Sequence, residues 1–261
     1  MKSEFSEFTY GFALANEIVG YFRSVITGAP ILPSLIEEGR TGGGYDLKIG
    51  INGQPVFLQF KLSSYLTRKN ASEWSIFGSP YYRFNLMPLS YSKQHNMLLD
   101  LENIGNSVYY SAPIFYESSD LNNYFINQQV VNNSIFISPS YIGRLPDNNE
   151  HHIIFQNKPT IAYMCSDPKE ISFKSGENII SMLKSKLKDS DKRRITNKSL
   201  VDLGNKMLLI ASEKNEEYKE QYEKLERISV KSQEDPFMFV SNISRILFGC
   251  EFFIISNESN N

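Results

Sequence analysis

The stretch GGGYDLKIGINGQPVFLQFKL, residues 42–62, decides the predicted fold. On both sides of Asn52-Gly53 its apolar residues alternate with other residues, which is the period of a β-strand. Asn-Gly is the preferred two-residue hairpin turn, because both turn positions adopt positive φ. The sequence therefore predicts a β-hairpin with strands over residues 45–51 and 55–62.

The predicted turn sets which residues face each other across the hairpin. Counting back from the turn places Asp46 opposite Gln59, with Cβ atoms roughly 4.5–5.5 Å apart. Lys61 follows on the same face, its Cβ roughly 6–7 Å from that of Gln59. Three polar side chains on a sheet face that should be buried need a reason, because burying unpaired polar groups costs free energy.

Phosphodiester cleavage supplies such a reason. A carboxylate and further oxygen ligands hold Mg²⁺, which activates water and neutralises charge on the phosphoryl group. A nearby lysine stabilises the negative charge that develops during the reaction. The residue types of the predicted hairpin therefore favour metal-dependent hydrolysis.

Gly44-Tyr45-Asp46, the predicted hairpin and Gln59-Phe60-Lys61 together resemble the PD-(D/E)XK nuclease superfamily, in particular its Mrr-like branch, where the second motif is often Q-x-K. The predicted order of elements over residues 5–116 (helix, strand, hairpin, helix, strand) is similar as well. The resemblance implies an α/β fold (α+β, with a mixed sheet) and a restriction-endonuclease-like core. It implies that Asp46 is the principal metal ligand, Gln59 a neutral ligand through its carbonyl oxygen, and Lys61 the catalytic lysine.

The same resemblance implies one more acidic ligand from the first helix, where Glu17 is the matching residue; a solvated helix residue is the alternative. Glu37 or Glu38 could serve instead. The expected cofactor is Mg²⁺ or Mn²⁺. Gln59 stands where many members have an acid, which should weaken metal binding and leaves a non-catalytic, nucleic-acid-binding descendant open.

Several residues are candidates for contacts with a nucleic acid. Gly43 and Gly44 could bind phosphate through backbone N–H groups, although a flexible approach to the strand is the simpler reading. Lys93, on a predicted helix, could touch the substrate backbone, and a surface role is the alternative for it and for the nearby His95. One concentrated basic run comprises Lys184, Lys186, Lys188, Lys192, Arg193, Arg194 and Lys198. It is either an exposed surface or a contact with DNA or RNA, in which Arg193 and Arg194 would take part.

Periodicity predicts the remaining elements. Residues 5–26 form a predicted helix that buries Phe8, Phe12 and their neighbours at helical spacing. Residues 63–87 read as an irregular insertion or lid. Further helices are predicted over residues 90–103, 118–131, 176–188, 197–212, 213–231 and 236–248, and strands over residues 107–115, 134–138, 152–156, 160–165 and 251–256. We expect a nuclease domain over residues 1–166 and a mainly helical region over residues 167–261, unless the apolar C-terminus packs back on the first part.

Composition limits the function classes. The 27 basic and 29 acidic residues give a net charge of −2, which argues against a generally basic nucleic-acid binder but leaves a local basic groove open. Cys165 and Cys250 are too few and too far apart for a disulfide framework. Adjacent His151 and His152 on a strand point to opposite faces, so they do not chelate one ion. The N-terminus lacks signal-peptide features and no apolar stretch reaches roughly 18 residues, so we expect a soluble cytoplasmic protein without a membrane segment.

These observations predict a Mg²⁺-dependent endodeoxyribonuclease, and the resemblance suggests a prokaryotic defence or restriction context. DNA is the expected partner. A ribonuclease with the same site and a non-catalytic nucleic-acid-binding or protein-interaction module are the alternatives. A homo-oligomer or a regulatory protein partner is compatible with the sequence.

Overall fold

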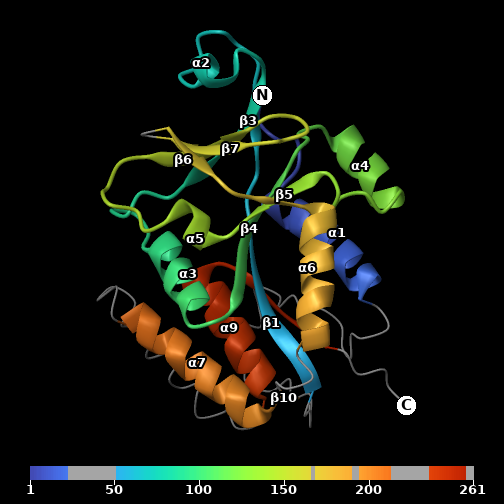
Figure 1. The fold of residues 1–261 in the computed structure, drawn as a ribbon, viewed down its shortest axis with the longest axis vertical. Coiled ribbons are helices and arrows are strands. Elements are labelled where there is room, and N and C mark those ends of the chain that lie inside the picture. Colours follow the sequence, from blue (N-terminus) through green and yellow to red (C-terminus); the bar gives the residue numbers. More distant parts are fainter. Residues whose placement is uncertain (23–50, 166–167, 190–193, 213–234, 257–261) are drawn as a thin grey trace. The chain divides into compact units, whose positions relative to one another are not determined.

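The computed structural model describes residues 1–22, 51–165, 168–189, 194–212 and 235–256, in which helices and strands are interleaved (Figure 1). This confirms the predicted α+β class. The chain divides into two compact units, the first formed by residues 1–21 and 58–184 and the second by residues 22–57 and 185–261. The expected boundary at residue 167 does not coincide with this division. The C-terminal part instead joins residues 22–57 in the second unit.

The sheet of the first unit is built on the end of strand β1 (Ile51–Phe60), from residue 58 onward. It continues with β4 (Ser107–Pro113), β5 (Ser134–Ile137) and β9 (Lys174–Ser175), in that order. β4 and β5 are antiparallel, as are β5 and β9. Every residue of β4 and β5 is buried, which is why these strands are continuous apolar runs broken only by serine.

The first unit contains a second, antiparallel sheet with the order β2-β3-β6-β7-β8. Its strands are β2 (Ser64–Leu66), β3 (Tyr81–Leu86), β6 (His151–Phe155), β7 (Ala162–Cys165) and β8 (Lys169–Ile171). The expectation of an irregular insertion over residues 63–87 is therefore wrong for β3, an inner strand of this sheet. Tyr81, Tyr82 and Phe84 are all buried, so apolar residues on both faces hide the alternation that marks a strand.

Six helices of the described residues belong wholly or mainly to the first unit: α1 (Glu7–Tyr21), the short α2 (Trp74–Phe77), α3 (Gln94–Asn103), α4 (Ser118–Ile126), the short α5 (Pro139–Ile142) and α6 (Gly176–Asp189). The predicted buried face of α1 is correct at Leu14, Ala15 and Ile18 but wrong at its N-terminal end. Phe8 and Phe12 are exposed, whereas Tyr10, Leu14 and Glu17 are buried. Because α1 carries apolar residues around most of its circumference, periodicity alone does not choose its inner face.

The predicted hairpin turn at Asn52-Gly53 is also wrong, because both residues lie inside the continuous strand β1. Asn52 pairs with Arg194, and Ile51 with Ile195, in the antiparallel strand β10 (Arg194–Ile195). A Cβ atom at Gly53 would lie 2.7 Å from the carbonyl oxygen of Ile255, so glycine is required for a close backbone approach and not for a turn. The register that placed Asp46 opposite Gln59 therefore has no basis, and residues 45–50 lie outside the described part.

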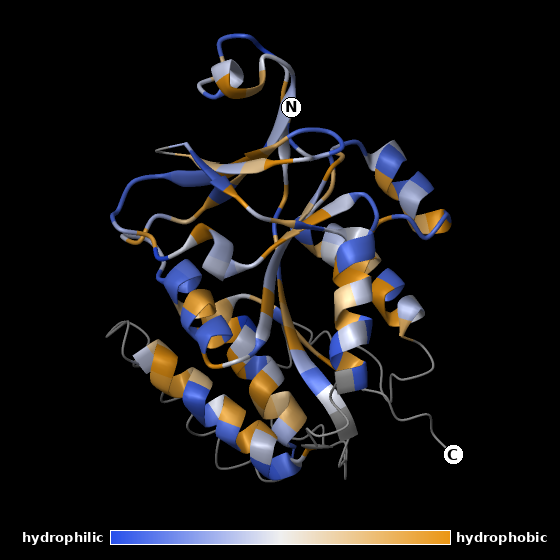
Figure 2. Ribbon diagram, in the orientation of Figure 1, coloured by the Kyte–Doolittle hydropathy of each residue, from blue (hydrophilic) through white to orange (hydrophobic). Residues whose placement is uncertain are grey.

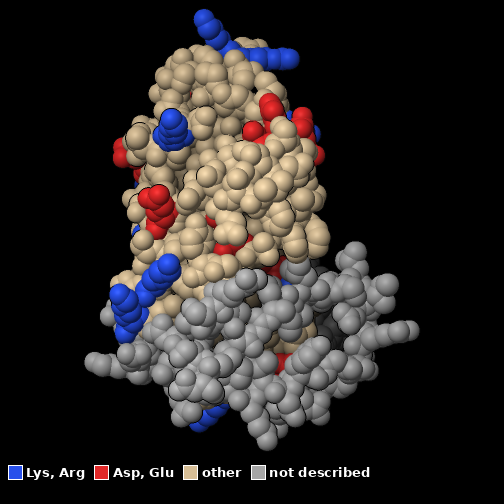
Figure 3. Space-filling model, turned by 90° about the vertical axis from the view of Figure 1, so that its right-hand side faces the viewer, with Lys and Arg blue, Asp and Glu red and all other residues tan. Residues whose placement is uncertain are grey.

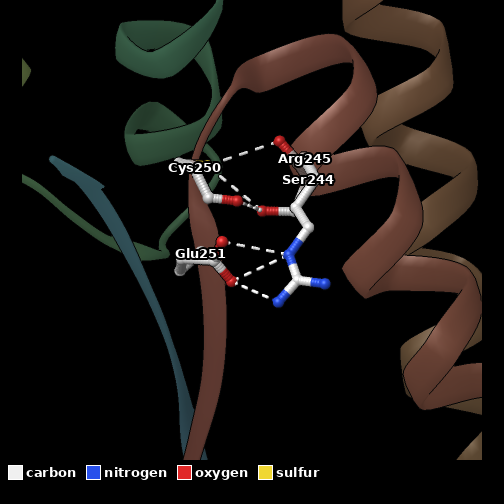
Figure 4. A network of polar contacts seen from close by, with 4 residues as sticks. All are labelled: Ser244, Arg245, Cys250 and Glu251. Carbon is white, nitrogen blue, oxygen red and sulfur yellow. Dashed lines mark hydrogen bonds and ion pairs between the residues drawn. The ribbon is translucent and has the colours of Figure 1, made fainter. Parts of the chain in front are cut away.

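The second unit combines β1 up to residue 57, β10 and β11 (Glu251–Ser256) with helices α7 (Asn197–Ser212) and α9 (Pro236–Phe248). The three C-terminal elements confirm their predicted ranges, and blue and orange residues alternate along α7 in Figure 2. Arg245 of α9 forms an ion pair with Glu251 of β11, Nη2 to Oε2 at 2.6 Å (Figure 4). The hydroxyl of Ser244 donates to the carbonyl oxygen of Cys250 at 2.7 Å, so two adjacent contacts hold the α9–β11 connection.

No helix in the described part of the chain is long and apolar enough to cross a membrane. Cys165 and Cys250 are both free and buried, in agreement with the expectation that they form no disulfide framework. The predicted helix over residues 213–231 lies outside the described residues.

Candidate active site

Gln59, at the end of β1, carries a buried polar atom without a partner. Its side chain is buried, at 4% exposure, and its Nε2 donates to the carbonyl oxygen of Phe60 at 3.2 Å. Among the described residues, Oε1 of Gln59 accepts no hydrogen bond. An unsatisfied buried acceptor costs about 1–3 kcal/mol, so it calls for a specific explanation. An amide carbonyl oxygen is a ligand type that Mg²⁺ and Mn²⁺ accept, so Gln59 fits the predicted role of a neutral ligand.

Lys61 lies two residues further along and is fixed through its backbone. Its amide nitrogen donates to the carbonyl oxygen of Ser111 in β4 at 2.9 Å. The side chain is half-buried; this burial lowers the pKa of Lys61, while the charge of Glu7 acts in the opposite direction. In the described part of the chain the ammonium has no ion-pair partner within 4.0 Å. A partly desolvated cation of this kind interacts more strongly with an incoming anion than an ordinary surface lysine does.

Contacts with α1 show on which face of the sheet the side chain of Gln59 lies. The ring of Phe60 packs edge-on against Tyr10, with centroids 6.1 Å apart. A Cβ atom at Gly11 would lie 2.5 Å from the same ring, so Phe60 faces α1 closely. Successive side chains of a strand point to opposite faces. Gln59, the neighbour of Phe60 in β1, therefore lies on the face that is turned away from α1.

His95 and Tyr110 lie on that same face, because Ser111, the neighbour of Tyr110, points to α1, where its hydroxyl bonds with Tyr10. Nε2 of His95 lies 2.7 Å from the carbonyl oxygen of Gly143, so this nitrogen carries the hydrogen. Nδ1 then accepts a hydrogen bond from the hydroxyl of Tyr110 at 2.8 Å. The two rings are stacked 5.8 Å apart at 6°.

Burial lowers the pKa of His95 to about 4, with a smaller contribution from Lys61. The imidazole is therefore neutral at pH 7, and it orients Tyr110. The expected surface role is wrong, since His95 is 3% exposed. The sequence feature that indicates its burial is its spacing of three and four residues from Leu98 and Leu99, which are buried on the same face of α3.

Glu17 is held at a different place. Its Oε2 accepts a hydrogen bond from the amide of Val131 at 3.0 Å, whereas Oε1 is buried without a partner among the described residues. The reading as a solvated residue is wrong, because the side chain is buried. Within the described residues, Glu17 makes no hydrogen bond or ion pair with Gln59 or Lys61. The structure does not bring these residues together, and the metal-ligand role of Glu17 stays a prediction.

The remaining predicted residues fall into two groups. Outside the described residues lie Glu37, Glu38, Gly43, Gly44, Asp46 and Arg193. Lys93 is described as the half-buried residue that precedes α3, and Arg194 as a member of β10 in the second unit, with its side chain undescribed. Their contact with a nucleic acid remains a prediction.

Glu7 was missed by the sequence reasoning, and it is the carboxylate that acts electrostatically on Lys61. A residue in the first turn of a helix gives no local signal for a contact with a strand more than 50 positions away.

The two adjacent histidines bind separate partners, as expected from their strand. Nε2 of His151 lies 3.0 Å from Oδ1 of Asp147, and Nε2 of His152 lies 2.5 Å from Oε1 of Glu73. In the part of the chain that the structure describes, no group of three or more His, Cys, Asp or Glu side chains is placed to hold a metal ion. The chain matches no protein-family model, and comparisons with curated proteins and with solved structures found no significant similarity.

Proposed function

We propose that this chain is a metal-dependent nuclease that hydrolyses phosphodiester bonds, with Asp46, Gln59 and Lys61 at its centre. The observation that supports it best is the buried, unpartnered carbonyl oxygen of Gln59, two residues before a partly desolvated lysine. Orphaned polar atoms and shifted pKa values cluster at functional sites. Gln59 is the last residue but one of β1, and Lys61 directly follows that strand.

Gln59, Asp46 and Lys61 have different roles in the proposed reaction. Gln59 Oε1 would be one ligand of Mg²⁺ or Mn²⁺, and the sequence resemblance alone assigns the carboxylate of Asp46 as another; the ion, when bound, would supply charge neutralisation and an activated water. Lys61 would place its ammonium against the phosphoryl oxygens, where negative charge develops. Its hydrogen bond to Ser111 fixes the backbone from which that side chain extends.

DNA is the proposed substrate, and a role in prokaryotic defence or restriction follows the sequence resemblance alone. RNA cleavage would use the same three residues with a different substrate. The alternative is a binding module without catalysis. In that case Gln59 replaces the acidic residue that many nucleases of the superfamily carry at this position, and activity has been lost.

The experiment that tests the proposal is a cleavage assay on four substrates: supercoiled plasmid, linear duplex DNA, single-stranded DNA and RNA. Each is incubated with Mg²⁺, Mn²⁺ or EDTA and with wild type, Asp46→Ala or the control Asp202→Ala, which changes an exposed acid of α7. We expect metal-dependent cleavage of DNA by wild type and by Asp202→Ala, and none by Asp46→Ala.

Two other results would redirect the proposal. Cleavage of RNA alone would make the chain a ribonuclease. Binding of nucleic acid without cleavage by all three proteins, in every metal, would favour the non-catalytic module.

A further inference from the structure

One face of the first unit, formed by α1 and α4, exposes large apolar side chains. Phe8 and Phe12 are one turn apart on α1 and are 69% and 50% exposed. At the end of α4, Phe125 and Ile126 are 39% and 78% exposed. The rings of Phe12 and Phe125 lie 6.2 Å apart, so the two helices form one continuous surface. These four residues are called the α1–α4 patch below.

The helices of the α1–α4 patch carry no positive charge, and their charged residues are acids at their N-terminal ends, Glu7 of α1 and Asp120 of α4, together with Glu17. The exposed ridge of α1 continues from Phe12 through Asn16 to Gly20 at four-residue spacing, and neither α1 nor α4 contains a lysine or arginine. Figure 3 shows the side of the molecule on which α4 lies, where uncharged areas lie between scattered acidic and basic side chains. Helices that face water normally carry charged residues on their outer side. This face therefore has the composition of a contact surface.

The lack of positive charge selects among the occupants. A nucleic acid requires lysine and arginine against its phosphates, and helices that lie on a membrane surface are rich in the same residues. A two-fold contact between identical chains places a patch against itself, so that charges of one sign would repel each other. An uncharged apolar patch suits that geometry. We propose that a second copy of this chain covers the α1–α4 patch.

An acid lies at the start of α1 and a lysine of α6 lies beside its end, which fits an antiparallel pairing. Glu7 lies in the first turn, and Nζ of Lys184 lies 5.7 Å from the ring centroid of Tyr21 at the last residue of α1. In a dimer whose two-fold axis is perpendicular to α1, the two α1 helices run antiparallel, and Glu7 would approach Lys184 of the partner subunit twice. Opposite charges at the rim set the register of a contact whose centre is apolar.

The exposed area is sufficient for the centre of a dimer interface. With about 200 Å² for each phenylalanine and similar areas for isoleucine, the α1–α4 patch leaves roughly 400 Å² of apolar surface open on each copy. A standard interface buries about 800 Å² on each partner, of which somewhat more than half is apolar. The four side chains would thus supply most of the apolar area that a stable dimer needs.

Sedimentation velocity of the full chain, from about 1 to about 100 µM, tests the proposal. We expect wild type to have twice the chain mass of 30.0 kDa. Phe12→Glu and Ile126→Glu should each weaken dimerisation at least about tenfold, because they put like charges across the two-fold axis. The milder Phe8→Ser should weaken it less, and Tyr91→Glu, at an exposed tyrosine outside the patch, should leave it unchanged.

Circular dichroism confirms that each variant is folded, and Phe8→Ser keeps the test open if a glutamate variant fails to fold. A wild-type protein of single-chain mass at about 100 µM would overturn the proposal. A dimer that persists in the patch variants would overturn it as well. Flotation of wild type with phosphatidylcholine vesicles, lost in Ile126→Glu, would assign the patch to lipid and also overturn it.

Discussion

The amide nitrogen of Lys61 donates a hydrogen bond to the carbonyl oxygen of Ser111, and the two atoms are 2.9 Å apart. The hydroxyl of the same serine lies 2.7 Å from the hydroxyl of Tyr10, which also donates to Ser134 Oγ at 2.9 Å. Tyr10 is fully buried in α1. A chain of hydrogen bonds therefore runs from the helix through β4 to the backbone of the proposed catalytic lysine.

Replacing Tyr10 by phenylalanine should destabilise the protein and disturb Lys61 indirectly. The hydroxyl of Ser111 would lose the tyrosine partner that it has in the buried interior, at a cost of about 1–2 kcal/mol. We expect the Tm to fall by roughly 3–6 °C for a chain of this size. The control Tyr91→Phe changes an exposed tyrosine and should melt as wild type does. Equal Tm values for the two variants would show that the buried network contributes nothing.

Two substitutions of Gln59 separate burial from metal binding. Gln59→Leu removes the unpartnered oxygen, so its free energy of unfolding should equal or exceed that of wild type while metal-dependent cleavage is lost. Gln59→Glu adds the negative charge that wild type lacks, and the Mg²⁺ concentration for half-maximal rate should fall about tenfold. Urea unfolding and a metal titration of the cleavage rate measure these effects. A Gln59→Leu protein with wild-type activity would remove Gln59 from the proposed site.

Glu73 should make the stability of the first unit depend on acid pH. It accepts hydrogen bonds from the hydroxyls of Ser72 and Tyr81, each at 2.6 Å, and lies beside His152. Burial raises the pKa of Glu73, but these hydrogen bonds and the charge of His152 outweigh burial and lower it from 4.5 to about 2. Because the folded pKa is the lower one, the stabilisation is present above pH 4.5 and is lost as the pH falls from 4.5 toward 2.

Glu73→Gln should therefore unfold more easily than wild type at pH 7, by about 2 kcal/mol, and the difference should shrink below pH 4.5. Urea unfolding at a series of pH values measures it, with the exposed Glu170→Gln as the control. A difference between Glu73→Gln and wild type that stays constant from pH 7 to about pH 3 would contradict this account.

Lys61→Met should be at least as stable as wild type. Burial lowers the pKa of Lys61, so the unfolded chain binds its proton more tightly and the folded state bears the cost of the charge. Methionine removes that cost, and the free energy of unfolding should rise by about 0.5–1 kcal/mol, or roughly 2–4 °C in Tm. Wild-type stability should itself increase as the pH rises through the lowered pKa. A strongly destabilised Lys61→Met would mean that the lysine has a structural role.

Much of the fold could be predicted from the sequence where a strand or helix has one inner face or a continuous apolar run, as in β4, β5 and α3. The turn at Asn52-Gly53 could not, because Gly53 is required by the carbonyl oxygen of Ile255, about 200 residues away in the chain. A local pattern cannot distinguish a glycine needed for a close approach from one needed for a turn.

The sequence singled out Gln59 and Lys61 as site residues, and their part in a metal site stays a prediction. Gln59 and Lys61 have the burial and the pKa shift that a functional pair would have. Glu7 and His95 were not predicted beside Lys61, because the folding of α1 and α3 around the sheet brings them there. Asp46 remains a prediction, outside the described residues.

The most direct test of the nuclease proposal is the single-turnover rate of plasmid cleavage by Lys61→Met in saturating Mg²⁺. The control is Lys69→Met, which changes an exposed lysine of the same unit. We predict that Lys61→Met is folded and stable but cuts at least about 100-fold more slowly than wild type, because a group that stabilises transition-state charge has been removed. Lys69→Met should cut at the wild-type rate. Cleavage by Lys61→Met at the wild-type rate would contradict the account.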